Sequence, residues 1–315
     1  MGMLSLAILK LSLIALLGAY LYKRKAITEE VLRFLTLFVI DFTVPALIFS
    51  HLIGNSQIVL SSPIWIFIVL SISIFIVGHL LGFIFSFKRS HEFKKEFTSL
   101  VCFQNSGYLP LNLALFLFPP IMREKFIVYI VLHLLGFNII MWSAGSFFVF
   151  KKKGEKFKLK SIFTPPIIST LFALFLIYTN TARFVPSLVL VPVRMVGDMS
   201  FVLSMLVLGS WLAKIKLKGL SQRLFYIGEA SFLKLMVLPG LFLIAVMKFE
   251  MFSLFGLFVV LQAAMPSAAS LPIIANLRGA DSEFVSQGVF LTHILSIFTI
   301  TFWLTLYLKL SGFYF

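Results

Sequence analysis

The fold is decided by a stretch that reads Gln104-Asn105-Ser106-Gly107-Tyr108-Leu109-Pro110-Leu111-Asn112. It lies in the middle of an apolar run, residues 97–118, that is long enough to cross a bilayer. Pro110 has no N–H to donate and clashes with the preceding turn, while Gly107 tolerates non-helical backbone. The pattern predicts a helix broken at mid-membrane, which is typical of the binding sites of secondary transporters. The alternative is a kinked helix whose polar residues pack against neighbours.

The composition indicates a helical membrane protein. Of the 315 residues, 60% are hydrophobic and 12% are charged, and the mean hydropathy is +1.04. The apolar runs are too long for barrel strands, so an all-α polytopic fold is predicted. Ten transmembrane helices are expected, at about 4–22, 29–52, 63–87, 97–118, 124–150, 161–179, 188–213, 229–248, 253–276 and 283–310. The first run precedes its basic residues, which predicts a retained helix rather than a signal peptide.

The basic residues are distributed unevenly between the two sides of the membrane. Loops after the odd-numbered runs hold 18 of the 27 Lys and Arg residues, whereas the opposite side holds five. The positive-inside rule therefore predicts a multi-pass protein of the cell membrane with both termini outside. The net charge of +15 is then mainly a topology signal. Contact with anionic membrane lipids is a secondary effect, and nucleic-acid binding is not expected.

The chain contains an internal duplication. Three pairs of like residues recur at offsets of 158, 157 and 160 positions: Gln104 and Gln262, Asp41 and Asp198, His133 and His293. Five spans per half is an odd number, so the second half must run through the membrane upside down. We predict two inverted five-helix repeats, residues 1–150 and 161–315, joined by a basic cytoplasmic loop at 151–160.

A second broken helix is predicted in the run 253–276. There, Gln262 leads into Pro266 and Pro272, which bracket four small residues and Leu271. Two broken helices in corresponding positions of inverted repeats, here spans 4 and 9, are expected to cross near the bilayer midplane. Each break exposes the N-terminus of a half-helix, whose free N–H groups favour an anion.

Five short motifs resemble those of the auxin efflux carrier family and occur along the chain in the same order as in that family. The fold of the family is of the bile acid/sodium symporter type. They are Asn-Ser-Gly-Tyr-Leu-Pro-Leu at 105–111, Val-Pro-Ala-Leu-Ile-Phe at 44–49, Gly-Asp at 197–198, Lys-Leu-Met-Val-Leu-Pro at 234–239 and Ala-Met-Pro-Ser-Ala at 264–268. The resemblance implies ten helices in two inverted repeats, a scaffold domain and a crossover domain, and elevator-type alternating access. It also implies a homodimer in many members, and export of organic anions such as auxin or malate.

The chain departs from the family pattern at two places. Members often carry an Asn a few residues after the ninth-span Pro, where this chain has Ser270. This departure leaves the substrate open. The long hydrophilic central loop of the plant exporters is also absent, which argues against regulation through a large phosphorylated loop.

Candidate substrate-binding residues are the polar and small residues of the two breaks. They are Gln104, Asn105, Ser106, Gly107, Tyr108, Gln262, Pro266, Ser267 and Ser270. Asn105 and Ser106 can donate hydrogen bonds to a carboxylate while carrying no charge, and we expect them to face Ser267 and Ser270 across one cavity. The alternative for these side chains is capping of the broken helix ends. Pro110, Pro266 and Pro272 are the predicted helix-breaking residues.

Candidate proton- or ion-coupling residues are the ionisable groups inside the spans, namely Asp41, Asp198, Lys234, His133 and His293. An ionisable residue in the membrane is costly and is by default a functional hypothesis. The alternatives are structural ion pairs with Arg33, Arg194, Lys234 or Glu229 for the charged residues, and a bond to a nearby carbonyl for the histidines. His51 and His79 are given no role.

The expected function is a secondary transporter that exports a small organic anion by alternating access, not an enzyme. No Walker-A run, His-Glu-x-x-His motif or Cys/His cluster is present, so no metal or cofactor is expected beyond H⁺ or Na⁺ as a coupling ion. A sodium-coupled importer of the bile-acid symporter type is the first alternative. A membrane receptor or an intramembrane enzyme is the alternative of another class.

Overall fold

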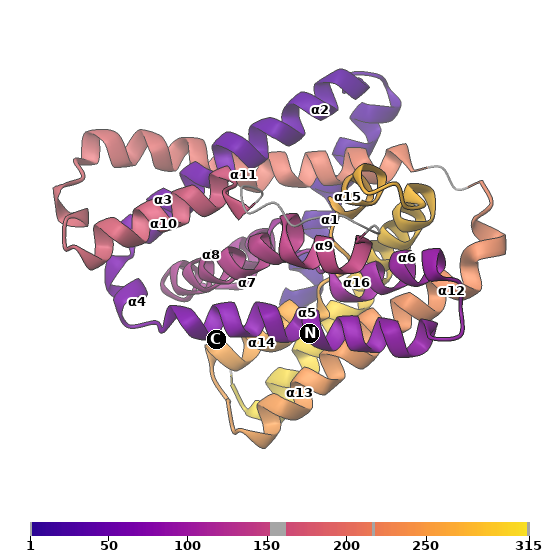
Figure 1. The fold of residues 1–315 in the computed structure, drawn as a ribbon. Helices are drawn as coiled ribbons and strands as arrows, with labels where there is room; N and C mark the ends of the chain where they lie inside the picture. The colour runs from indigo at the N-terminus through magenta and orange to yellow at the C-terminus, as the bar shows by residue number, and fades with distance from the viewer. Residues whose placement is uncertain (1, 152–161, 216–217, 314–315) are drawn as a thin grey trace.

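The computed structural model describes residues 2–151, 162–215 and 218–313, and every regular element in these ranges is a helix (Figure 1). The only extended pairing among the described residues is one isolated bridge between Gln104 and Ser267. The predicted all-α class is confirmed for this part of the chain. Apart from Lys151, the predicted basic loop 151–160 lies outside the described residues.

The first half of the described chain contains ten helical elements. They are α1 Gly2–Lys23, α2 Glu29–Phe38, the π-helix η1 Val39–Thr43, α3 Val44–Gly54, α4 Ser56–Leu60, α5 Ile64–Ser86, α6 His91–Cys102, α7 Tyr108–Leu117, α8 Pro120–Trp142 and α9 Ala144–Phe150. The described residues of the second half also form only helical elements. Its elements are α10 Pro165–Tyr178, the 3₁₀ turn η3 Ala182–Phe184, α11 Ser187–Lys214, α12 Leu220–Phe232, the π-helix η4 Leu233–Val237, α13 Leu238–Lys248, α14 Leu254–Ala264, α15 Leu271–Leu277 and α16 Ser282–Ser311.

Seven continuous helical segments in the described residues are long and apolar enough to cross a membrane. Three shorter apolar helices, α7, α10 and α14, lie within the predicted spans 97–118, 161–179 and 253–276. The chain therefore has the helices of a multi-pass membrane protein. The count of ten spans and the inverted relation of the two halves stay predictions.

Local sequence signals explain where several helices begin and end. Thr28 precedes α2 and accepts a hydrogen bond from the Val31 N–H, and Asp281 precedes α16 and accepts from the Phe284 N–H at 2.9 Å. Side-chain caps of this kind satisfy N–H groups that have no partner inside the helix. At its other end, α16 is followed by Gly312 in the left-handed conformation, with φ 63°.

Both predicted helix breaks lie where the sequence places the small and polar residues. The helix of the first break ends at Cys102 and resumes at Tyr108, and that of the second ends at Ala264 and resumes at Leu271. Pro266 lies within the second gap, whereas Pro272 is the second residue of α15 and Pro110 the third of α7. The backbone leaves the helix before Pro110, at the residues that precede it.

The helices pack in two groups; in Figure 1, α2, α10 and α11 lie toward the top of the view, and α5, α13 and α14 toward the bottom. The scaffold group consists of α1, α2, η1, α3, α10 and α11, in which α11 packs against α1 and α3, and α3 against α10. The crossover group consists of α5–α9 and α12–α16, with α5 against α6 and α8, and α14 and α15 against α16. The groups meet where α7 packs on α1 and α11, and where α8 packs on α3 and α10.

Helices α1 and α11 approach each other closely through two glycines. A Cβ atom on Gly209 would lie 1.8 Å from the Ala15 carbonyl oxygen, and one on Gly18 would lie 2.2 Å from the Leu206 carbonyl oxygen. The Ser210 hydroxyl donates a 3.0 Å hydrogen bond to the Gly18 carbonyl. Small residues at a helix interface permit this backbone contact, which is typical of membrane helix pairs.

We expect Gly209→Ala to destabilise the scaffold group, because the added methyl group meets backbone atoms that cannot rotate away. Overpacking of this kind costs roughly 1–3 kcal/mol, and thermal unfolding in lipid nanodiscs measures it. Gly228→Ala is the matched control, since a Cβ on this helical glycine meets nothing within 4 Å. Equal unfolding temperatures for the two variants would contradict the close contact between α1 and α11.

Candidate functional site

The two helix breaks cross and pair with each other through their backbones. The Asn105 N–H donates to the Pro266 carbonyl at 2.7 Å, and the Ala268 N–H donates to the Phe103 carbonyl at 3.0 Å. Backbone groups at this depth must find partners within the protein, because the hydrocarbon of a bilayer offers none. The antiparallel pairing therefore supplies the bonds that each broken helix has lost.

Two predicted binding residues stabilise the crossing instead of lining a cavity. The Ser267 hydroxyl donates to the Leu100 carbonyl at 2.6 Å, and the Ser267 N–H donates to the Thr292 hydroxyl at 3.3 Å. The Gln262 side-chain amide donates to the Ser106 carbonyl at 3.4 Å. Ser267 and Gln262 are fully buried. Their contacts are those of residues that hold the two breaks together.

A cavity of about 290 Å³ lies beside the crossing, between the scaffold group and the crossover group. Residues 104–108 of the first break and 268–270 of the second line one wall. The opposite walls come from η1 and α3, from the second half of α8 and from the start of α10. Asn105, Ser106 and Ser270 thus line one cavity, together with Gln104, Gly107 and Tyr108, whereas Ser267 is not among its lining residues.

His133 and His293, which were paired by their offset in the sequence, contact two of the candidate binding residues. His293 Nδ1 lies 2.8 Å from the Val289 carbonyl oxygen, so this nitrogen carries the proton and donates it. His293 Nε2 is then an acceptor, and the Asn105 side-chain amide donates to it at 3.2 Å. His133 Nε2 lies 3.5 Å from the Ser106 hydroxyl. Both histidines are buried, and these contacts orient the two side chains that line the cavity.

The acidic and basic coupling candidates are not gathered at one place. Asp41 lines the cavity and is the only charged residue among the described residues that line it. Lys234 is fully buried in η4, which packs against α6, and its ammonium group has no hydrogen-bond partner within the described ranges. Asp198 lies elsewhere, with one oxygen 3.3 Å from a ring nitrogen of His51.

The alternative ion pairs considered for Lys234 are not formed. Glu229 pairs with Arg89 at 2.5 Å, and Asp198 contacts His51. Arg194 pairs with Glu124 at 2.7 Å, so it is not the partner of an acidic coupling candidate. Lys234 therefore stays without a counter-ion among the residues that the structure describes.

A family model described as a membrane transport protein matches residues 3–304, nearly the whole chain. The chain belongs to the auxin efflux carrier-like family of membrane transport proteins. The resemblance in the five sequence motifs is thereby confirmed, and the protein is a membrane transporter. Among curated proteins, a comparison finds no significant match.

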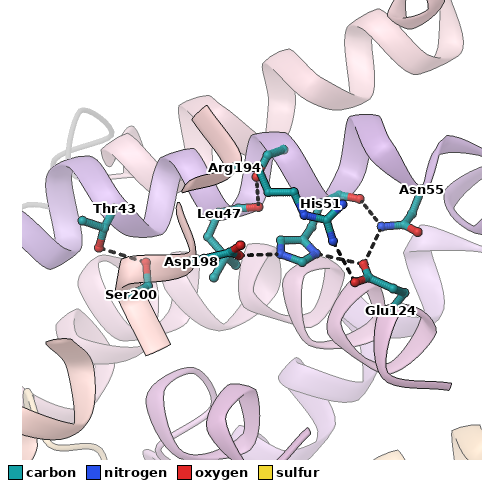
Figure 2. A network of polar contacts seen from close by, with 9 residues as sticks. Thr43, Leu47, His51, Asn55, Glu124, Arg194, Asp198 and Ser200 are labelled. Atoms are coloured by element: carbon teal, nitrogen blue, oxygen red, sulfur yellow. Dashed lines mark hydrogen bonds and ion pairs between the residues drawn. The ribbon is translucent and has the colours of Figure 1, made fainter. Parts of the chain in front are cut away.

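The transporter also contains a polar cluster that the sequence analysis missed (Figure 2). It joins His51 of α3 and Asn55 directly after this helix to Glu124 of α8 and to Arg194 and Asp198 of α11. The sequence contained one indication of this cluster. His51 and Asn55 are four residues apart, as are Arg194 and Asp198, so each pair lies on one face of its helix. Nothing in the spacing indicated that the two faces and Glu124 would meet.

Proposed function

We propose that this transporter exports a small organic anion, such as a dicarboxylate or an auxin-like acid, by elevator-type alternating access. The observation that supports the proposal is the cavity beside the crossed breaks, between two separately packed groups of helices. A substrate in this cavity would contact the crossover group on one side and the scaffold group on the other. Relative movement of the two groups would then carry it across the membrane.

The chemistry of the cavity suits an anion that must be released again. Asn105, Ser106 and Ser270 supply hydrogen-bonding groups without charge, and the ten-residue helix α7 begins at the cavity wall. The free N–H groups and the dipole of a helix N-terminus favour a carboxylate there. No Lys or Arg is among the described residues that line the cavity, so none of these residues would form a salt bridge with a bound anion. The volume is at the small end of ligand pockets, which favours a small acid.

Helix α8 lines the cavity with its second half and contacts the scaffold group near its start. Asn138 and Trp142, near the end of α8, line the cavity, whereas Glu124, near its start, is bound to the scaffold group. Glu124 and Trp142 are about 27 Å apart along the helix axis. With the topology predicted from the basic residues, the cavity faces the cytoplasm and the opposite side is closed. An exporter loads its substrate in this state.

We expect Asp41→Asn to strengthen binding of an anionic substrate. An ionised carboxylate in the cavity wall repels an anion, and its removal is expected to lower the dissociation constant roughly tenfold. Thermal-shift titrations with malate and with indole-3-acetate measure this change, because a ligand stabilises the folded state by mass action. Weaker binding in the variant would indicate that the substrate, or an ion bound with it, is a cation.

Transport itself is tested in proteoliposomes with Na⁺ and H⁺ gradients imposed separately. We expect counterflow of a carboxylate without Na⁺. Uptake driven by a Na⁺ gradient alone would contradict the exporter assignment and support the sodium-coupled importer. Absence of counterflow with every carboxylate, in folded protein, would contradict transport of an organic anion at this site.

A further inference from the structure

The polar cluster between α3, α8 and α11 places a carboxylate at each ring nitrogen of one histidine. His51 Nδ1 lies 3.1 Å from Glu124 Oε2, and His51 Nε2 lies 3.3 Å from Asp198 Oδ1 (Figure 2). The His51 ring is only 2% exposed. Both contacts are hydrogen-bond distances, so each requires a hydrogen atom between the nitrogen and the oxygen.

The two contacts of the His51 ring require one hydrogen atom more than a neutral imidazole supplies. A neutral imidazole has one N–H and one lone pair, so it can donate to only one of two carboxylates. The other nitrogen would direct its lone pair at a carboxylate oxygen. Glu124 is itself an ionised acceptor, because Arg194 donates to Oε1 at 2.7 Å and Asn55 donates to Oε2 at 3.0 Å. The additional proton then lies between His51 Nε2 and Asp198. Imidazole is ordinarily a stronger base than a carboxylate, so this proton belongs on His51, as an imidazolium ion.

The charges of the cluster balance only when this proton is present. Glu124 and Asp198 contribute two negative charges, and Arg194 contributes one positive charge. The His51 imidazolium ion supplies the second positive charge and brings the sum to zero, which lowers the cost of placing the cluster in the protein. The side chains of Glu124 and Asp198 are 30% and 49% exposed, so the cluster reaches the surface of the protein.

The cluster spans the boundary between the two groups of helices. His51, Asn55, Arg194 and Asp198 come from the scaffold group, whereas Glu124 comes from α8 of the crossover group. Helices α3 and α11 are firmly packed, since a Cβ on Gly197 would lie 2.6 Å from the backbone of Leu47. Movement of α8 relative to this pair must therefore remove Glu124 from the cluster and leave the other four residues in place.

We propose that His51, Glu124 and Asp198 form a proton-binding site that locks the crossover group to the scaffold group. When Glu124 is docked, His51 binds a proton at both ring nitrogens. When Glu124 departs, only Asp198 remains, and a neutral His51 satisfies that contact with its single N–H. Undocking therefore releases one proton. The coupling to substrate movement rests on the proposed function, whereas the protonation of His51 does not.

The dependence of Glu124 docking on pH has a definite sign. The docked arrangement binds one proton more than the undocked one, so lowering the pH favours docking and raising the pH favours release. A difference of one proton changes the ratio of the two states by up to tenfold per pH unit.

The groups that face His51 come from two elements. They are Glu124 from α8, and Arg194 and Asp198 from α11. Helices α4 and α10 also pack on α3, but α4 has no titratable residue, and α10 has only Tyr178, at its last position. Asp41, in η1, is ten residues before His51 and lines the cavity. The described neighbours of His51 thus offer no further group to take its proton.

Nitrogen NMR of histidine labelled with ¹⁵N, in nanodiscs, tests the proton site without any measurement of transport. The chain has five histidines, and the signal lost in His51→Gln identifies the one in question. We expect this signal to be that of an imidazolium ion at pH 7. In Glu124→Gln, we expect the imidazolium fraction to fall about tenfold, because one carboxylate acceptor is gone. A neutral His51 in the unmodified protein at pH 7 would overturn the proposal.

Two further measurements complete the test. His79→Gln is the matched control, because His79 lies in α5 outside the cluster, and we expect it to leave the His51 signal unchanged. Thermal unfolding establishes that Glu124→Gln is folded. If the His51 signal behaves as expected but no carboxylate is transported, the proposed function fails and the proton site stands. If transport is found and His51 is neutral, the proton site fails alone.

Discussion

Asn105→Ala is expected to reduce transport roughly 10- to 100-fold while the protein stays folded. The side chain lines the cavity and donates to His293 at 3.2 Å, so its removal deletes a positioned polar group from the candidate site. Loss of one such bond, with its partner left unsatisfied, costs about 1–3 kcal/mol. The Asn105 backbone N–H, which donates to Pro266, is retained in the variant. The crossing should therefore survive.

The matched control is Asn112→Ala, an asparagine in the same stretch with a different environment. Asn112 donates to the Tyr108 carbonyl and to the Ser204 hydroxyl, and it does not line the cavity. We expect Asn112→Ala to lower the unfolding temperature and to leave substrate affinity within about twofold. Counterflow rates and thermal-shift titrations on both variants measure the difference. Unchanged affinity in Asn105→Ala would place the substrate site elsewhere in the protein.

Lys234→Met is expected to stabilise the fold and to abolish transport. Lys234 is fully buried, and its ammonium group has no hydrogen-bond partner in the described part of the chain. Burial of a charge without a partner costs several kcal/mol, so an apolar side chain of similar length should gain about 2 kcal/mol or more. An intramembrane lysine that lowers stability in this way is expected to serve function, as strained functional residues often do.

Thermal unfolding and counterflow are measured together for this variant. Lys10→Met is the control, because Lys10 is an exposed lysine of the apolar helix α1 and lies 5.5 Å from the Phe116 ring centre. We expect the control to change stability by less than about 0.5 kcal/mol. If Lys234→Met destabilises the protein, the ammonium group has a partner in the membrane, such as a bound ion. If it stabilises the protein without loss of transport, Lys234 has no part in coupling.

Several features could be predicted from the sequence because they depend only on residues close together in the chain. A proline in an apolar run, with Gly107 three positions before it, disrupts a helix wherever the run lies. The same reasoning found the second break before Pro266. The five collinear motifs predicted the family, which is confirmed over residues 3–304. The seven long apolar helices follow from run lengths that match the thickness of a bilayer.

The roles of individual side chains could not be read in the same way. Ser267 and Ser270 are three residues apart in one motif, yet one bonds to the Leu100 carbonyl and the other lines the cavity. His133 and His293 were paired by their offset, but the partners Ser106 and Asn105 depend on how the helices cross. A side chain's contacts depend on the rotation and depth of its helix, and small shifts along the sequence change both.

The polar cluster around His51 shows most clearly what could not be predicted from the sequence. His51 and Glu124 are 73 positions apart, and His51 and Asp198 are 147 apart. His51 and Glu124 lie at the ends of their predicted spans, and Asp198, although it was a coupling candidate, was paired by its offset with Asp41 and not with His51. Broken helices, membrane helices and family membership followed from local chemistry and segment length, for which the order of residues suffices. The contacts of His51, the cavity, and the burial of Lys234 without a partner in the described part of the chain arise only when distant helices pack, because burial and hydrogen-bond distance are properties of the assembled fold.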